Sequence, residues 1–437
     1  MLLCAHYILP ITSEPIQRGA VLVRDGRIYD VGPVDILKAH YPEEEVKDFG
    51  MAALMPGLID LHVHLRDPGQ TYKETVETGA AAAAHGGFTT VLAMPNTKPV
   101  TDDRLNIRYV HNKAKAMAPI HVLQAGAITK GQKGKELADI ESMVAEGAPA
   151  ISEDGKSVMD SLLCKEAMKI AAECGVPVMA HCEDIDLVDG GVANDDESIR
   201  KQGLRGISNA VEDIIAVRDV MLAGETGAHL HLCHCSTYGS VEIVKQAKKQ
   251  DIHVTAEVCP HHFTLTSKDV DASDANYKMN PPLRTKKDVE ALKRGLRDDI
   301  MDVIATDHAP HTLAEKELGF LEAPNGIIGL ECAYGVCHKV LVDGGFISDE
   351  RLIELMSVGP AELMGHVPTD VAALVEDYAE PAPTGDDPDG VIAGESDAQP
   401  QREGVNRLLD LSRVDDADNV DLVVLNAAEE WTVDPEQ

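Results

Sequence analysis

Short apolar stretches that alternate with amphipathic stretches constrain the fold of this chain most strongly. Eight of them have the length of a strand, at residues 58–65, 88–95, 120–127, 148–153, 176–181, 229–235, 253–259 and 302–307. Helical patterns lie between them, among others at residues 72–85, 162–174, 210–225 and 240–250. Strands that alternate with helices form parallel βα units, and eight such units predict an α/β fold with a closed (β/α)8 barrel of the TIM type.

The two ends of the chain follow a different pattern. Residues 19–32 form a hairpin pattern with a turn at residues 25–26, and residues 420–425 form one more apolar strand. We therefore expect a small β-domain built from both termini. Residues 1–52 would supply its first part, residues 53–366 the barrel, and residues 367–437 an acidic insertion and the last part of the small domain. Within that insertion, residues 378–403 are rich in Pro, Gly, Asp and Ala, which predicts disorder.

The charge of the chain limits its partners. Asp and Glu number 74 against 39 Lys and Arg, a formal net charge of −35. Such a surface repels the phosphates of nucleic acids and anionic membranes, so we expect neither as a partner. It is typical of a protein that stays solvated at high salt, and we hypothesise a salt-rich, halophilic cytoplasm. The chain shows no membrane-spanning stretch and no secretory signal pattern, and its nine scattered cysteines favour a reducing compartment.

Polar residues follow the predicted strands at the end where barrel enzymes carry their catalytic groups. On a continuous first strand, His62, His64 and Arg66 would face the same way. Later strand ends supply Asn96, Glu153, Asp154, His181, His234, Asp307 and His311. Histidine nitrogen and carboxylate oxygen suit zinc, and either Asp154 or Glu153 could bridge two ions. A hydroxide shared by two such ions attacks amide-type bonds, and Asp307 could move its proton.

Other polar residues near these strand ends have simpler interpretations. We interpret Cys233 as a small core residue, with metal binding as the alternative. We interpret His231 as a histidine that packs in the core or orients a metal ligand. Residues 261–262, two histidines, either orient a ligand or only pack at a strand end. Lys73 and Lys316 are interpreted as solvated, with guidance of an anion as the alternative for either.

Two long segments carry a resemblance to a known family. Residues 60–68 (Asp-Leu-His-Val-His-Leu-Arg-Asp-Pro) and 305–316 (Ala-Thr-Asp-His-Ala-Pro-His-Thr-Leu-Ala-Glu-Lys) resemble the two signature segments of dihydroorotases, within the amidohydrolase superfamily. Shorter segments fall in the family's order, at residues 94–97, 152–155, 181–184, 234–237 and 279–284. The resemblance covers residues 1–366. The chain resembles the bacterial-type class I of this family in particular. That class bridges its metals with an aspartate, where hydantoinases and allantoinases commonly use a carboxylated lysine.

The resemblance implies a ligand set and roles for individual residues. Two zinc ions per subunit would be held by His62, His64, Asp154, His181, His234 and Asp307. Asp154 and a hydroxide would bridge the ions, and Asp307 would act as general acid and base. Arg66 and Asn96 would bind the substrate carboxylate, with His311 nearby and Asn280 lining the substrate pocket.

The implied reaction is the reversible cyclisation of N-carbamoyl-L-aspartate to L-dihydroorotate and water, in pyrimidine (UMP) biosynthesis in the cytoplasm. One alternative is a hydrolase of another cyclic amide, an allantoinase or hydantoinase. Aspartate rather than lysine at position 154, together with Arg66 and Asn96, favours the dihydroorotase reaction over this alternative. A second alternative is a non-catalytic partner of aspartate carbamoyltransferase, which we rank last because all six ligands are present. The chain could also form a homo-oligomer.

Overall fold

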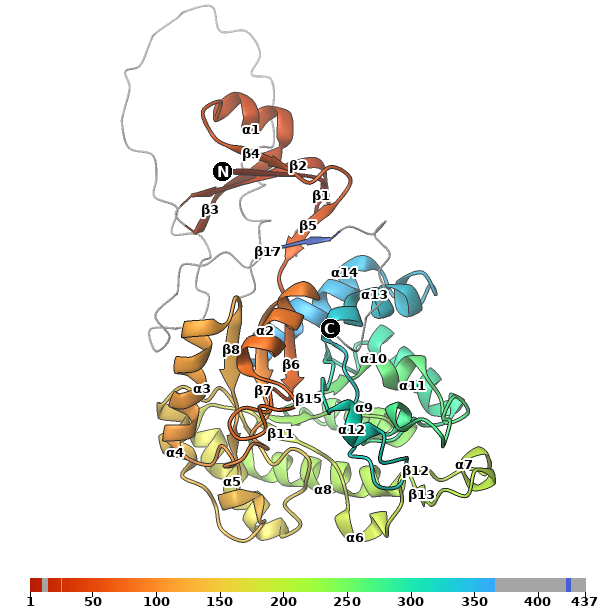
Figure 1. Cartoon of the computed structure of the whole chain (residues 1–437). Coiled ribbons are helices and arrows are strands. Elements are labelled where there is room, and N and C mark those ends of the chain that lie inside the picture. Colours follow the sequence, from red (N-terminus) through yellow and green to blue (C-terminus); the bar gives the residue numbers. More distant parts are fainter. Residues whose placement is uncertain (10–14, 25, 366–421, 426–437) are drawn as a thin grey trace, which may run out of the picture. The chain divides into compact units, whose positions relative to one another are not determined.

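A computed structural model describes residues 1–9, 15–24, 26–365 and 422–425 of the chain. The predicted acidic segment at 378–403 lies outside the described residues. These residues divide into two compact units, one with Met1–Pro56 and strand β17 (Leu422–Leu425), the other with Gly57–Gly365. The elements from β6, in orange, to α14, in light blue, belong to the second unit (Figure 1).

The first unit is a sheet that contains strands from both ends of the chain. Its strand order is β17-β5-β1-β2-β3, with β4 paired to β1. The predicted hairpin is present as the antiparallel pair β2–β3, and β17 pairs antiparallel with β5. Helix α1 packs Val34 and Leu37 against apolar side chains of the sheet, because these two residues lie on one face of the helix. The bounds are β1 (Leu2–Ile8), β2 (Ile16–Arg24), β3 (Arg27–Pro33), α1 (Val34–His40), β4 (Val46–Asp48) and β5 (Ala53–Pro56).

The second unit is the predicted parallel barrel. Its strands are β6 (Leu58–Val63), β7 (Phe88–Ala93), β8 (His121–Gln124) continued by β9 (Gly126–Ala127), β10 (Ile151–Ser152), β11 (Val178–Ala180), β14 (Leu230–Leu232), β15 (Val254–Val258) and β16 (Val303–Ile304). They pair in parallel in the orders β6-β7-β8 and β9-β10-β11-β14-β15-β16. A parallel bridge between Val63 and His308 joins the first strand to the segment after the last. Buried apolar side chains such as Leu61, Met179 and Val303 form the core inside the strands.

Helices follow the strands in sequence and complete the βα units. Many begin at an acidic or hydroxyl side chain that accepts a bond from a backbone N–H of the first turn, as Asp103 and Asp160 do. No helix of the described residues is long and apolar enough to cross a membrane. Helices of ten or more residues are α2 (Val76–His85), α3 (Arg104–Met117), α5 (Ser161–Cys174), α8 (Ala210–Thr226), α9 (Tyr238–Lys248) and α11 (Lys286–Arg297). The shorter elements are α4 (Ile140–Ala145), α6 (Ile185–Val188), β12 (Ala193–Asn194), α7 (Glu197–Lys201), β13 (Gly206–Ile207), α10 (Pro260–Thr264), α12 (Leu313–Lys316), α13 (Ala333–Cys337), α14 (Asp349–Ile353) and α15 (Gly359–Leu363).

The strands are shorter than predicted, and this changes how the first of them presents its side chains. Strand β6 ends at Val63, so Arg66 lies beyond it with a φ of 58°. The prediction that Arg66 continues the alternation of a strand is therefore wrong. His234 and Asp307 also have positive φ values, of 32° and 49°. A non-glycine residue in this region is strained, and such strain is typical of functional sites.

Candidate metal centre

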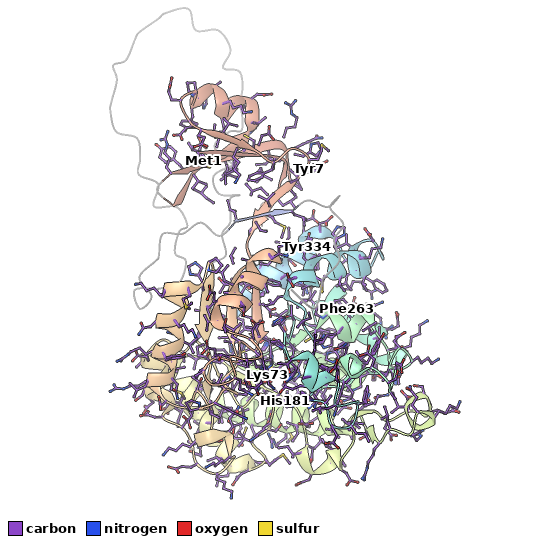
Figure 2. The ribbon with its side chains drawn as sticks, in the orientation of Figure 1. Met1, Tyr7, Lys73, His181, Phe263 and Tyr334 are labelled. Atoms are coloured by element: carbon purple, nitrogen blue, oxygen red, sulfur yellow. The ribbon has the colours of Figure 1, made fainter. Side chains whose placement is uncertain are left out.

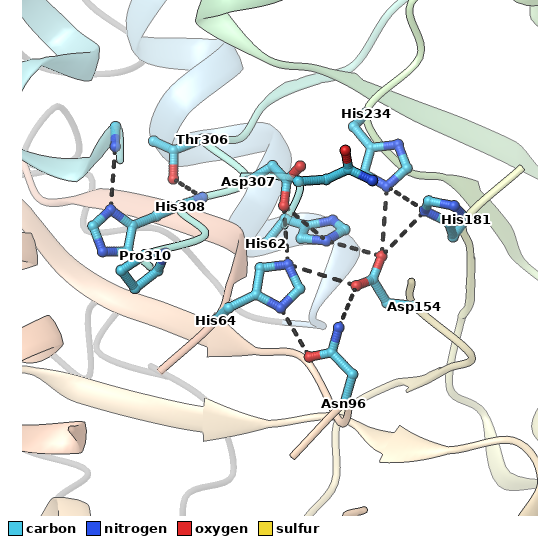
Figure 3. Close-up of polar contacts among 12 residues, drawn as sticks. His62, His64, Asn96, Asp154, His181, His234, Thr306, Asp307, His308 and Pro310 are labelled. Atoms are coloured by element: carbon cyan, nitrogen blue, oxygen red, sulfur yellow. Dashed lines mark hydrogen bonds and ion pairs between the residues drawn. The ribbon is translucent and has the colours of Figure 1, made fainter. Parts of the chain in front are cut away.

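The carboxyl ends of the barrel strands bring together the six residues that the resemblance assigned to metal binding. His181, labelled in Figure 2, lies within the barrel unit, and Figure 3 shows the group with Asp154 between the imidazoles. The members are His62, His64, Asp154, His181, His234 and Asp307, and all of them are buried. Such burial of polar groups is costly unless they are paired or bind a metal.

Asp154 is the central carboxylate of this group. Its Oδ1 lies 3.2 Å from His62 Nε2, 3.5 Å from His234 Nε2 and 3.6 Å from His181 Nδ1. Its Oδ2 lies 3.5 Å from His64 Nε2. One carboxylate therefore faces four imidazoles, three at Oδ1 and one at Oδ2. Glu153, the other residue considered for the bridge, bonds instead to the backbone N–H and hydroxyl of Thr129.

Asp307 is the second carboxylate, and it faces the same Nε2 atoms of His62 and His64 that Asp154 faces. Its Oδ1 lies 2.9 Å from His64 Nε2 and 3.7 Å from His62 Nε2. The ligand atoms of His62, His64 and Asp307 lie within 4.8 Å of one another, and so do those of His62, Asp154 and His234. His181 Nδ1 lies 2.9 Å from His234 Nε2. The predicted ligands of the first ion, His62, His64 and Asp307, therefore lie close together. Those of the second ion, Asp154, His181 and His234, adjoin them.

The carboxylates and imidazoles of this group shift one another's pKa values. Burial alone raises the pKa of Asp154, but His62 and the other imidazoles outweigh it and hold this pKa well below its ordinary value. Burial likewise acts to lower the pKa of His62, but Asp154 and Glu257 raise it well above the ordinary value. The pKa of Asp307 is lowered to about 2, because His64 and His62 outweigh its burial. Both carboxylates are thus ionised and available as ligands at neutral pH.

The residues present fit a metal centre. His62 Nε2 is buried and has no hydrogen-bond partner among the described residues, although it faces Asp154. A divalent cation would take the place of the positive charge that the imidazoles otherwise carry as protons. All the surrounding ligand atoms are imidazole nitrogens and carboxylate oxygens, which zinc and related divalent ions accept.

Glu257, on β15, orients two of the histidines. It was not identified as a residue of the site from the sequence alone. It is fully buried, and its Oε1 accepts from His62 Nδ1 at 2.7 Å and from the backbone N–H of His234 at 3.0 Å. Its Oε2 accepts from His231 Nε2 at 3.0 Å. His231 therefore does not reach the metal site directly, and it helps to hold the carboxylate that orients His62. An acidic residue in a short, mostly apolar strand was the signal that could have identified Glu257.

Asp60 joins the first barrel strand to the segment that carries Asp307. Its carboxylate accepts from the Thr306 hydroxyl at 2.6 Å, from the Thr306 N–H at 3.1 Å and from the His62 N–H at 3.0 Å. Burial raises the pKa of Asp60 to about 7, an effect that these hydrogen bonds oppose. Asp60 thereby fixes the backbone next to one ligand from each segment.

Asn96 lies against two of the proposed ligands. Its Oδ1 accepts from His64 Nδ1 at 2.9 Å, and its Nδ2 donates to Asp154 Oδ2 at 3.1 Å. Because a carbonyl oxygen only accepts, His64 carries its proton on Nδ1 and turns Nε2 toward Asp307. The structure therefore places Asn96 where it orients the imidazole of His64.

Arg66, Lys73 and His311 form a cationic group beside the metal centre. His311 Nε2 lies 2.8 Å from the Asn325 carbonyl and must donate to it, which leaves Nδ1 to accept from Lys73 Nζ at 3.0 Å. Burial, Arg66 and Lys73 lower the pKa of His311 to about 3. Lys73 also pairs with Glu315 at 2.8 Å, and its side chain is only 7% exposed. The interpretation of Lys73 as solvated is wrong, because this histidine and carboxylate hold it in the interior.

Two further predicted residues lie at the edge of the group. Asn280 Nδ2 donates to Glu183 Oε1 at 2.9 Å, and Glu183 Oε2 lies 3.2 Å from His181 Nε2. Asn280 is thus on the His181 side of the centre. Lys316 is not solvated as predicted, because its ammonium group contacts four backbone carbonyls, those of Ala275, Lys278, Pro324 and Gly326.

Comparison with known proteins agrees with this geometry. A family model described as "Dihydro-orotase-like" matches residues 52–240, and a bacterial imidazolonepropionase-like composite domain matches residues 19–43. The chain is 48% identical to the dihydroorotase of Geobacillus kaustophilus over 323 residues, 74% of this chain and 76% of that one. It is 44% identical to the dihydroorotase of Acetivibrio thermocellus over 346 residues, 79% of this chain and 80% of that one.

The chain belongs to the dihydroorotase family. Solved structures of related cyclic amidohydrolases share the fold of this dihydroorotase-family chain. The dihydropyrimidinase of Brevibacillus agri aligns with a TM-score of 0.72 at 24% identity, over 84% of this chain and 82% of that one. The D-hydantoinase of Thermus sp. aligns with a TM-score of 0.70 at 26% identity, over 83% and 81%. The predicted amidohydrolase barrel is confirmed.

Proposed function

We propose that this chain is a zinc-dependent dihydroorotase, which interconverts N-carbamoyl-L-aspartate and L-dihydroorotate with loss or gain of water. One observation carries the proposal: a complete set of imidazole and carboxylate ligands lies beside a cationic group formed by Arg66 and Lys73. The ligand set would hold the metal ions that help to open an amide bond, and the cationic group matches an anionic substrate. The relatives at 44–48% identity are dihydroorotases, which supports the same reaction.

Arg66 binds the substrate carboxylate in this proposal. A guanidinium group offers parallel N–H donors that match the two oxygens of a carboxylate. Lys73 lies beyond neutral His311, and Glu315 pairs with its ammonium group at 2.8 Å, so Arg66 supplies the positive charge that is left for the substrate. This local charge explains how a chain of net charge −35 binds an anion.

The metal ions would be held by His62, His64 and Asp307 on one side and by His181 and His234 on the other, with Asp154 between them. When bound, divalent ions polarise the amide carbonyl and lower the pKa of water. Glu257 and Asn96 keep His62 and His64 in the orientation that the centre requires.

Asp307 moves the proton of the reaction. In ring opening, the oxygen of water bonds to the ring carbonyl carbon and the bond from this carbon to the ring nitrogen breaks. The Asp307 carboxylate accepts one proton from the attacking water and returns it to the departing nitrogen. The other proton of the water stays on the new carboxyl group, which releases it to solvent at neutral pH. Asp307 is ionised and oriented by His64 before the substrate arrives.

The second candidate function is hydrolysis of an uncharged cyclic amide. The solved structures of similar fold are a dihydropyrimidinase and a D-hydantoinase, at 24–26% identity. Aspartate at position 154 and the buried guanidinium group of Arg66 favour the anionic substrate instead. Assembly as a homo-oligomer or with aspartate carbamoyltransferase stays a prediction.

Replacement of Asp307 tests this proposal. We expect Asp307→Asn to fold and to lower ring opening of L-dihydroorotate by about 10²–10⁴-fold, the usual contribution of a proton-transfer group. Asp298→Asn is the matched control, because Asp298 lies on the surface beside Arg297. Metal content measured on each variant separates loss of the proton carrier from loss of a ligand. Activity of Asp307→Asn equal to that of the control would contradict the assigned role.

A further inference from the structure

A second group of metal-ligating side chains lies at the junction of β15 and α10. Cys259 follows the last residue of β15 directly, and His261 and His262 lie on α10 next to Phe263, which Figure 2 labels. The exposed fractions are 0% for Cys259, 8% for His261 and 1% for His262. One ligand atom from each residue lies within 4.8 Å of the others. None of these three residues belongs to the centre described above.

One ring nitrogen of each histidine in this group has no hydrogen-bond partner among the described residues. His262 Nε2 lies 2.9 Å from the carbonyl oxygen of Pro281, which can only accept, so Nε2 carries the proton. His262 Nδ1 therefore presents a lone pair, and it is buried with no donor among the residues that the structure describes. His261 Nε2 is buried and unpartnered in the same part of the chain. A histidine held through one nitrogen by a carbonyl is the usual arrangement of a metal ligand.

Both imidazoles are neutral at physiological pH, as metal ligands must be. Burial lowers the pKa of His262 to about 4, although its bond to Pro281 opposes this. Burial and the neighbouring His262 place the pKa of His261 well below its ordinary value. Neither histidine needs to lose a proton before it can bind a cation.

We propose that Cys259, His261 and His262 form an additional metal site, which takes Zn²⁺ or a similar thiophilic divalent cation. One sulfur and two imidazole nitrogens are a ligand set that zinc favours, with bonds of about 2.3 Å to sulfur and about 2.0–2.1 Å to nitrogen. Binding breaks the Cys259 S–H bond, forms a sulfur–metal bond and releases one proton to solvent. Burial raises the pKa of this thiol, so cations with little affinity for sulfur are excluded.

Cobalt(II) distinguishes this site from the centre proposed for catalysis. That centre contains only nitrogen and oxygen ligands, whereas the site at Cys259 adds a thiolate. Thiolate bound to Co²⁺ gives an intense charge-transfer absorption that imidazole and carboxylate ligands do not. The full-length protein, freed of metal and titrated with Co²⁺, is therefore expected to show this absorption, and to bind one more equivalent of Co²⁺ than Cys259→Ser.

Cys233→Ser is the matched control, because Cys233 is also buried and lies within 4.8 Å of ligand atoms of His62 and Glu257. The control is expected to keep the absorption and the additional equivalent. Absence of the absorption in the unaltered protein, or its loss in Cys233→Ser and survival in Cys259→Ser, would overturn the proposal. If Cys259→Ser does not fold, His261→Asn replaces it. That variant is expected to lose the additional equivalent, and its retention would overturn the proposal.

The result does not depend on the proposed enzymatic activity, since it compares absorption and bound metal between variants. Catalytic failure with a positive cobalt result would leave the site at Cys259 standing. Catalysis with a negative cobalt result would remove that site alone.

Discussion

Glu257→Gln is the substitution whose effect follows most directly from the distances. The Glu257 carboxylate receives three N–H groups, from the side chains of His62 and His231 and from the backbone of His234. Glutamine has nearly the same shape but no charge. Its carbonyl can still accept from His62 and His234, and its NH₂ group then faces His231, which can shift its proton to Nδ1 and bond to Thr255.

The expected size of the effect comes from the lost charge. Hydrogen bonds to a charged group contribute about 1.5–3 kcal/mol, and those between neutral groups about 0.5–1.5 kcal/mol. Two imidazole contacts therefore weaken by about 2–3 kcal/mol in total. At about 1.4 kcal/mol per factor of ten, this predicts a loss of about 30–150-fold in metal affinity or in kcat/KM.

The assay measures ring opening of L-dihydroorotate, together with zinc retained after dialysis against a chelator of graded concentration. Glu225→Gln is the matched control, because Glu225 pairs with Lys165 at the surface and is 60% exposed. The unfolding transition of both variants shows whether the fold is kept. If Glu257→Gln holds zinc and turns over substrate within twofold of the control, the inference that Glu257 orients His62 is refuted.

Three other predictions follow from the charges. Arg66→Lys keeps the charge but loses the two-pronged contact, so kcat/KM should fall by about 10–100-fold, mainly through KM; an unchanged KM would exclude carboxylate binding by Arg66. Because the folded-state pKa of His311 is about 3, its imidazole should remain neutral between about pH 5 and 8 in an NMR titration. That pKa lies below the ordinary value of about 6.5. As pH falls, the imidazole therefore takes up its proton in the unfolded chain before it does so in the folded protein. The free energy of unfolding should fall as pH drops from about 6.5 toward 3, and less so in His311→Asn; equal slopes would contradict the shift. With a net charge of −35, the protein should melt at higher temperature in molar KCl than at low ionic strength, and a salt-independent Tm would refute the halophilic hypothesis.

The barrel and the ligand residues could be predicted because their signals are local in sequence. Each strand is a short apolar stretch, and residues such as His62 and His181 lie at the strand ends, where a closed barrel must bring them together. The left-handed backbone of Arg66 could not be predicted, because strand length depends on pairing with neighbours distant in sequence. Charge partners were missed for the same reason. Glu257 meets His62 across 195 positions, and Lys73 meets His311 across 238.

The most direct test of the account is a comparison of two substrates by the purified, zinc-loaded chain in molar KCl. One is L-dihydroorotate, and the other is the same ring without its carboxylate. We expect the ultraviolet absorbance of L-dihydroorotate to be lost on ring opening, with kcat/KM at least about tenfold above that for the uncharged ring, because Arg66 lies beside the proposed metal centre. Equal or faster opening of the uncharged ring, or no turnover of L-dihydroorotate by folded and metal-loaded protein, would contradict it.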